Sequence, residues 1–143
     1  MTENLELLTF IHSNAEMGKT TMKQLLGIVE NGNFKSLLES QAREYNEIYN
    51  ISDEKIKGSQ EQTKSINPLA KASVYMKINM NTMGNKTPSH ISEMLIQGST
   101  MGMIDIIKRI HQYKNADKTD LDLASRLLKF EENNINELKT YLQ

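Results

Sequence analysis

The sequence contains no cysteine and no tryptophan, and only two of its 143 residues are proline. Without cysteine, the chain has no disulfide, no thiolate metal ligand and no cysteine nucleophile. Aromatic residues make up 6% of the chain, and the formal net charge is −1. This composition disfavours nucleic acid or an anionic membrane as a partner, since both attract basic surfaces.

Long apolar runs are also missing, and no stretch approaches the roughly 20 residues that a membrane-spanning helix needs. The first ten residues, MTENLELLTF, carry acidic but no basic side chains, so we expect no secretory leader. A content of 38% hydrophobic and 24% charged residues is typical of a globular protein. We therefore expect one domain over residues 1–143, in the cytoplasm.

What the chain does have is apolar residues recurring at helical spacing in four long segments. The first segment runs from about Glu3 to Glu30, and the second from about Phe34 to Ile56. Between them, Asn31-Gly32-Asn33 is expected to supply a left-handed C-cap and then an N-cap. A connection this short predicts that the two helices form an antiparallel hairpin.

The third and fourth segments repeat this arrangement. Thr87-Pro88 is a helix start signal, and the third helix is expected to run to about Lys114. Thr119, with Asp122 three residues later, resembles a capping box that would start a helix running to the C-terminus. The polar turn between these helices is again brief, so a second antiparallel hairpin is predicted.

The connection between the hairpins, residues 58–87, is long. Its first part, residues 58–66, is polar and could be a loop or a frayed helix end. Asn67-Pro68 then predicts a short helix to about Met83. A helix of about 28 residues is about 42 Å long, and this connection can carry the chain back along that length. The predicted fold is an all-α four-helix bundle with one long crossover containing a short helix.

This pattern, with the segments NAEMGKTTMKQLLGIVE and GSTMGMIDIIKRIHQYKN, resembles the ferritin-like superfamily, in particular its small bacterial members with lost or altered metal ligands. The resemblance implies a ferritin-like bundle. Metal-binding members supply a Glu from each of two helices and Glu-x-x-His from each of the other two. Here the nearest equivalents, residues 131–134 (EENN) and 41–44 (QARE), both lack the histidine. The resemblance therefore implies a degenerate di-metal site.

One carboxylate nevertheless points inward by helical projection. Glu131 lies at the centre of the apolar face of the last segment and midway along it. An unpaired buried carboxylate is costly, so Glu131 must be paired, protonated or metal-bound. We expect a buried polar network in which Glu131 accepts hydrogen bonds from Tyr45 and Gln41. Alternatively, Glu131 reaches solvent.

A second alternative is a metal site made of carboxylates. Glu16, Glu44 and Asp105 stand at mid-height on the other three segments, toward the sides of their apolar stripes. If these side chains converge on Glu131, they could hold iron or manganese. Such a site would bind these metals more weakly than one that includes histidine. His12, four residues before Glu16, is expected to form a half-buried or solvated ion pair with it.

Helix-surface features point to association. The segment from Pro88 is apolar over much of its circumference, so more than one neighbour must cover it. Gly98 and Gly102 would allow a neighbouring helix or a symmetry mate to approach closely. Met76, Met80 and Met83 share one face of the expected crossover helix, where they could fill the core, contact a partner or bind Cu(I). We therefore expect a possible homodimer through the third helix and the crossover, or an unidentified protein partner.

The sequence contains no phosphate loop and no nucleophile motif. The functional prediction is a non-enzymatic cytoplasmic bundle with an interaction or structural role and no cofactor. The alternative is a divergent ferritin-like metal-binding or redox protein that uses the four carboxylates.

Overall fold

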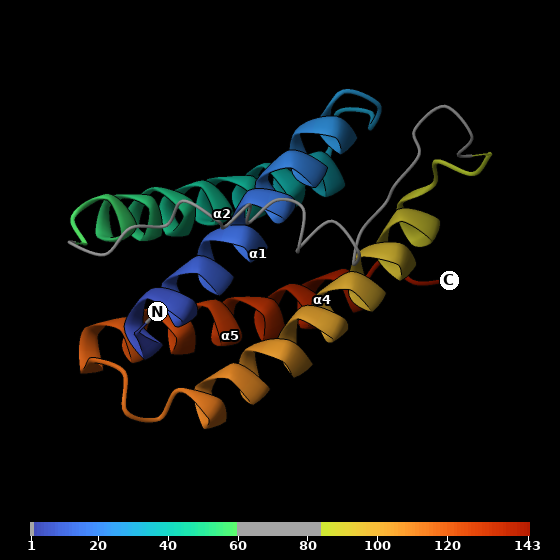
Figure 1. Ribbon diagram of the computed structural model, residues 1–143. Coiled ribbons are helices and arrows are strands. Elements are labelled where there is room, and N and C mark those ends of the chain that lie inside the picture. The colour runs from blue at the N-terminus through green and yellow to red at the C-terminus, as the bar shows by residue number, and fades with distance from the viewer. Residues whose placement is uncertain (1, 60–83) are drawn as a thin grey trace.

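The computed structural model describes residues 2–59 and 84–143, and the predicted crossover helix and its methionines lie outside these ranges. The described residues form four α-helices (Figure 1). They are α1 (Glu3–Leu26), α2 (Asn33–Lys57), α4 (Pro88–Gln112) and α5 (Lys118–Lys139). The predicted all-α four-helix bundle is confirmed.

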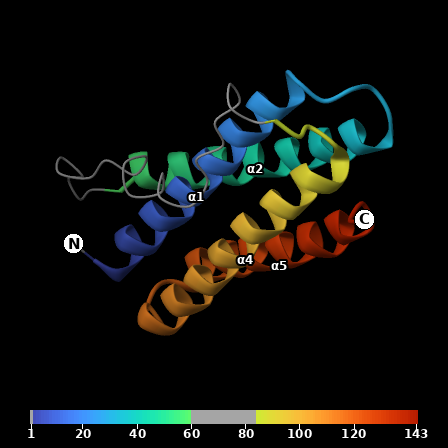
Figure 2. The same cartoon turned by 90° about the vertical axis from the view of Figure 1, so that its right-hand side faces the viewer.

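The helices pack as two antiparallel hairpins, α1 with α2 and α4 with α5 (Figures 1 and 2). At one end of the bundle, the backbone N–H of Asp117 before α5 donates to Oδ1 of Asn4 in α1 at 2.6 Å. At the same end, Nζ of Lys55 in α2 donates to Oδ1 of Asp120 in α5 at 3.0 Å. The starts of α1 and α5 and the end of α2 therefore lie together.

The opposite end holds the start of α4, where the backbone N–H of Gln143 donates to Oγ of Ser89 at 3.0 Å. The chain therefore leaves α2 at one end of the bundle and enters α4 at the other (Figure 1). As a result α2 and α4 run parallel, and residues 58–87 have to connect the two ends. This order of directions is that of a bundle with one long crossover.

Helix boundaries differ from the sequence predictions at four points. The helix predicted to reach Glu30 ends at Leu26, because the N–H of Gly27 bonds back to the carbonyls of Gln24 and Leu25. Gly32 has a φ of 140°, which favours glycine, but it is the N-cap of α2 and not a C-cap of α1.

The capping box predicted at Thr119 is also wrong. The first turn of α5 begins one residue earlier, at Lys118, with Asp117 as the N-cap and no side-chain capping bond. The helix ends at Lys139, short of the C-terminus. In contrast, the predicted start of α4 is confirmed, since Oγ1 of Thr87 accepts a hydrogen bond from the N–H of His90 at 3.2 Å.

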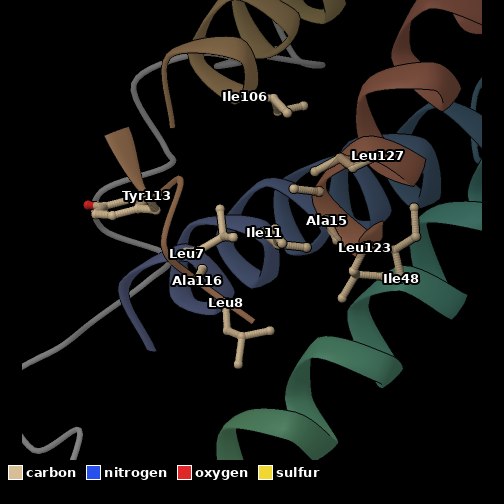
Figure 3. Packing of buried hydrophobic residues seen from close by; sticks show 11 residues of the cluster. Leu7, Leu8, Ile11, Ala15, Ile48, Ile106, Tyr113, Ala116, Leu123 and Leu127 are labelled. Atoms are coloured by element: carbon tan, nitrogen blue, oxygen red, sulfur yellow. The ribbon is translucent and has the colours of Figure 1, made fainter. Parts of the chain in front are cut away.

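Two apolar clusters occupy the two ends of the bundle. The cluster nearer the α4–α5 turn, here called the turn-end cluster, draws on all four helices and on the turn itself (Figure 3). The cluster nearer the α1–α2 connection is here called the loop-end cluster. The turn-end cluster consists of Leu7, Leu8, Ile11, Ala15, Ile48, Ile106, Tyr113, Ala116, Leu123, Ala124 and Leu127. The loop-end cluster consists of Met22, Leu25, Phe34, Leu38, Tyr45, Ile91, Leu95 and Leu138.

Candidate functional site: a polar layer between two apolar clusters

Polar and small residues separate the two clusters on α1, α4 and α5, and on α2 the hydroxyl of Tyr45, a member of the loop-end cluster, reaches the same level. On α5, for example, Glu131 and Asn134 lie between Leu127 of one cluster and Leu138 of the other. We call this region the central polar layer. It comprises Asn14 and Gly18 on α1, Gln41 and Tyr45 on α2, Gly98, Ser99 and Gly102 on α4, and Glu131 and Asn134 on α5.

Glu131 is the centre of this layer. Glu131 is only 2% exposed, so the sequence prediction that its side chain points inward is confirmed. The phenol of Tyr45 donates a hydrogen bond to its Oε1 at 3.0 Å, as expected. Its other oxygen, Oε2, is buried and has no hydrogen-bond partner in the described part of the chain.

Burial controls the acid–base state of this pair. Desolvation raises the pKa of Glu131 from 4.5 to about 7, although hydrogen bonds from Ser99 and Tyr45 oppose the rise. Burial also raises the pKa of the Tyr45 phenol well above its usual value, and the nearby charge of Glu131 adds to this. Glu131 is therefore a carboxyl group that changes charge near neutral pH, next to a phenol that stays neutral.

Gln41 does not join the hydrogen bond, and this part of the predicted network is wrong. It is 2% exposed, as expected, but neither Nε2 nor Oε1 has a hydrogen-bond partner among the described residues. Gln41 lies one helical turn before Tyr45, or about 6 Å along the axis. Because α2 and α5 run in opposite directions, Gln41 lies at the level of the turn after Glu131.

Glycine makes the close packing of this layer possible. A Cβ atom on Gly18 would lie 2.3 Å from the Tyr45 ring, so only glycine leaves room for the ring at this position. A Cβ atom on Gly102 would lie 3.2 Å from Nδ2 of Asn14 and 3.9 Å from Oε1 of Glu131. Gly102 therefore faces α1 and α5 within the bundle, so of the two expected alternatives it is a neighbouring helix that approaches this glycine.

The four carboxylates of the alternative metal site, Glu131, Glu44, Glu16 and Asp105, contact different neighbours and do not converge on one point. Glu44 accepts two hydrogen bonds from Arg126 of α5, at 3.0 and 2.9 Å, which raise the pKa of the guanidinium. Glu16 lies near Tyr49, whose pKa is raised by burial and then by this negative charge. Asp105 keeps one buried oxygen, Oδ2, that has no partner within residues 2–59 and 84–143.

No three side chains of histidine, aspartate or glutamate in the described ranges converge as a metal ion would require. The His12–Glu16 pair predicted from the sequence is also not formed. Instead, Nε2 of His12 lies 3.1 Å from Oδ1 of Asp53 on α2, and Lys57 bonds to the other oxygen of Asp53 at 2.8 Å. Hydrogen bonds from Lys57, and more weakly from His12, lower the pKa of Asp53 against the effect of burial.

Sequence reasoning did not identify Asn14 and Ser99, which contribute polar groups from α1 and α4. It also did not identify Arg126, which binds Glu44 outside the layer. Gly18 was the one sequence feature that could have indicated the site, because a glycine within an apolar helical stripe usually marks a place where a neighbouring helix or side chain packs closely. The pairings themselves depend on the register between helices, which periodicity within one helix does not determine.

A small cavity opens beside Glu131. Its volume is about 20 Å³, and its lining residues come from all four helices. They are Asn14, Met17, Gly18, Tyr45, Gly98, Gly102 and Glu131. This volume is enough for one water molecule and too small for an organic substrate.

A larger hollow of about 730 Å³ lies at the other end of the bundle, between the α1–α2 connection, the start of α4 and Tyr141. Most of its lining residues are exposed loop residues, and Glu30 and Lys86 are the charged ones. None of the buried side-chain atoms without a partner belongs to its lining, so the central layer is the stronger candidate site.

None of the described helices, α1, α2, α4 and α5, is both long and apolar enough to cross a membrane. Comparison with protein-family models, with curated proteins and with solved structures gives no match to this chain.

Proposed function

We propose that this protein is a non-enzymatic helical bundle that acts by self-association through the outer face of α4. The observation that carries the proposal is a stripe of exposed apolar side chains on that helix. Met101 is 43% exposed, Ile104 is 46% exposed and Ile107 is 36% exposed. Exposed apolar side chains gathered on one face are typical of interaction sites, whereas isolated ones are not.

The charges around this stripe favour a second copy of the chain as the partner. Glu93 and Lys108 are both exposed and lie on the same face as Met101 and Ile104. In an antiparallel pair of α4 helices related by a two-fold axis near Met101, Glu93 of one copy would lie opposite Lys108 of the other. Opposite charges facing each other across a symmetric contact fix its register and suppress other pairings.

The proposal extends to the origin and location of the protein. The resemblance to ferritin-like proteins remains a proposal, supported by the order and direction of the four helices. An ancestral metal site that has degenerated is supported by the separation of Glu44, Glu16 and Asp105 into different environments. The lack of cysteine agrees with a reducing compartment such as the cytoplasm.

The test is the molar mass in solution, measured by light scattering after size-exclusion chromatography. Wild type is expected to be a dimer and Ile104→Lys a monomer. Leu142→Lys is the matched control, since Leu142 is equally exposed at 45% but lies outside the stripe, and it is expected to stay dimeric. Glu93→Lys should weaken the dimer, and adding Lys108→Glu should restore it. A monomeric wild type at high concentration would contradict the proposal.

A second experiment addresses the metal site. Fe(II) or Mn(II) is titrated into wild type and into Glu131→Gln, and binding is measured by isothermal titration calorimetry. We expect no stoichiometric binding in either protein. Stoichiometric binding that is lost in Glu131→Gln would replace the proposal with a carboxylate metalloprotein.

A further inference from the structure

Oε2 of Glu131 is a buried polar atom that has no hydrogen-bond partner among the described residues. The residue as a whole is only 2% exposed. The opposite oxygen of the same carboxyl group has the Tyr45 phenol as a donor at 3.0 Å. Buried polar atoms nearly always have a partner, which is a bound water or ion where the protein supplies none.

The cavity beside Glu131 has the dimensions for such a partner. Its volume of about 20 Å³ exceeds the roughly 10–15 Å³ that one water needs, but leaves no room for a second large group. Gly18, Gly98 and Gly102 line the cavity, which stays open because glycine has no side chain to fill it. A Cβ position on Gly102 lies 3.2 Å from Nδ2 of Asn14 and 3.9 Å from Oε1 of Glu131, and both residues line this cavity.

We propose that this cavity binds one water molecule, which accepts a hydrogen bond from Nδ2 of Asn14 and donates one to the carboxyl group of Glu131. An ammonium ion does not suit the site, because it has no lone pair with which to accept from Nδ2. A divalent metal ion does not suit the site, because a single carboxylate faces the cavity and no second acidic side chain lines it. This inference is independent of the α4 surface, which lies on the outside of the bundle.

The groups that face Glu131 are all uncharged around neutral pH. They are Tyr45 from α2, Ser99 from α4 and Asn14 from α1. No lysine, arginine or histidine lines the cavity to neutralise an ionised Glu131. A bound water that donates to the carboxyl group would therefore stabilise its ionised form.

Gly102→Ala tests the site, because the added methyl group enters the cavity and meets Asn14. Oxygen-17 relaxation dispersion counts long-lived internal waters without interference from hydroxyl groups. Wild type is expected to hold one such water more than Gly102→Ala. Asn14→Leu, which removes the other partner, is expected to lose the same water and serves as a second variant if Gly102→Ala does not fold.

An ammonium chloride titration, with sodium chloride as the control, checks that the occupant is water and not a cation. The proposal predicts no difference between the two salts in the midpoint of Glu131 ionisation, together with the loss of one long-lived water in both variants. A fall in this midpoint that ammonium causes and sodium does not, and that Gly102→Ala abolishes, would overturn the proposal in favour of a bound ammonium ion. The proposal is also overturned if neither variant changes the water count.

Discussion

The turn-end cluster and the central polar layer are built from the same four helices but are stabilised in opposite ways. In the cluster, Ile11, Ala15, Ile48 and Leu127 are fully buried and carry no polar side-chain atom. In the layer, Gln41, Asn134 and Glu131 are equally buried and keep polar atoms that have no partner in the described chain. The cluster stabilises the fold, whereas the layer costs stability that the cluster has to offset.

This difference locates the chemically responsive part of the molecule. A protein retains a buried carboxyl group at a cost when the group fixes helix register or takes part in function. The hydrogen bond between Glu131 and Tyr45 joins α5 to α2 and so favours one register of these helices. The cavity beside Glu131 gives a small ligand access to the carboxyl group.

The largest effect is expected in the apolar region. Leu127→Ala should lower the free energy of unfolding by about 2–5 kcal/mol, because it removes buried methyl groups and leaves a cavity among side chains from several helices. Gln41→Leu, at an equally buried position of the polar layer, should change stability by less than about 1.5 kcal/mol, since neither Nε2 nor Oε1, which it removes, has a partner in the described chain. Urea unfolding of both variants measures the contrast. Equal losses in the two would remove the distinction between the regions.

The next largest effect is a pH dependence caused by Glu131. Its pKa is about 7 in the fold and about 4.5 in the unfolded chain, so the folded state binds the proton more tightly between these values. The contribution of Glu131 to stability is therefore complete below pH 4.5 and is lost as pH rises through 7. At about 1.4 kcal/mol per pKa unit, the loss is about 3 kcal/mol.

Glu131→Gln removes this dependence. Its stability relative to wild type should rise by about 3 kcal/mol between pH 4.5 and pH 8, as measured by urea unfolding at several pH values. Glu132→Gln, which changes the adjacent exposed carboxylate, provides the control and should follow the wild-type curve. If the two variants behave alike, Glu131 is not the buried titrating group.

A smaller effect is expected from Tyr45→Phe. It removes the hydrogen bond that the phenol donates to Oε1 of Glu131, and should cost about 1–3 kcal/mol. Since the hydrogen bond from Tyr45 lowers the pKa of Glu131, its loss should also raise that pKa above 7. Tyr49→Phe, at the partly exposed α1–α2 contact, is the matched control and should leave the pKa of Glu131 unchanged.

The smallest effect is expected at the surface of the same helices. Arg126→Gln removes the two hydrogen bonds to Glu44, yet both side chains are more than a quarter exposed. Solvent screens such pairs, so the free energy of unfolding should fall by less than about 1 kcal/mol at moderate ionic strength. A loss of several kcal/mol would show that this pair, and not the central layer, is the main polar contact between the hairpins.

The sequence was sufficient to predict features that depend on one helix at a time. The inward direction of Glu131 follows from its place among Leu127, Leu128 and Leu138 on one helical face. The start of α4 at Pro88 follows from local capping chemistry, which requires no knowledge of the neighbours. The two hairpins follow from their short connections.

Features that depend on the register between helices could not be predicted. His12 pairs with Asp53 on α2 and not with Glu16, which is closer in sequence. Glu44 likewise has its partner on α5. Gln41 was placed beside Glu131 although it lies a turn away, because helical projection gives the direction of a side chain but not its height against another helix. For the same reason, the sequence could not predict the cavity or the position of Asn14 beside Glu131.

The most direct test of the central polar layer is a carbon-13 NMR titration of the Glu131 carboxyl group, assigned by comparison with Glu131→Gln. The account predicts one carboxyl resonance with a midpoint near pH 7, which disappears in that variant and moves to higher pH in Tyr45→Phe. A midpoint near the ordinary value of 4.5, or a midpoint that Tyr45→Phe leaves unchanged, would contradict it.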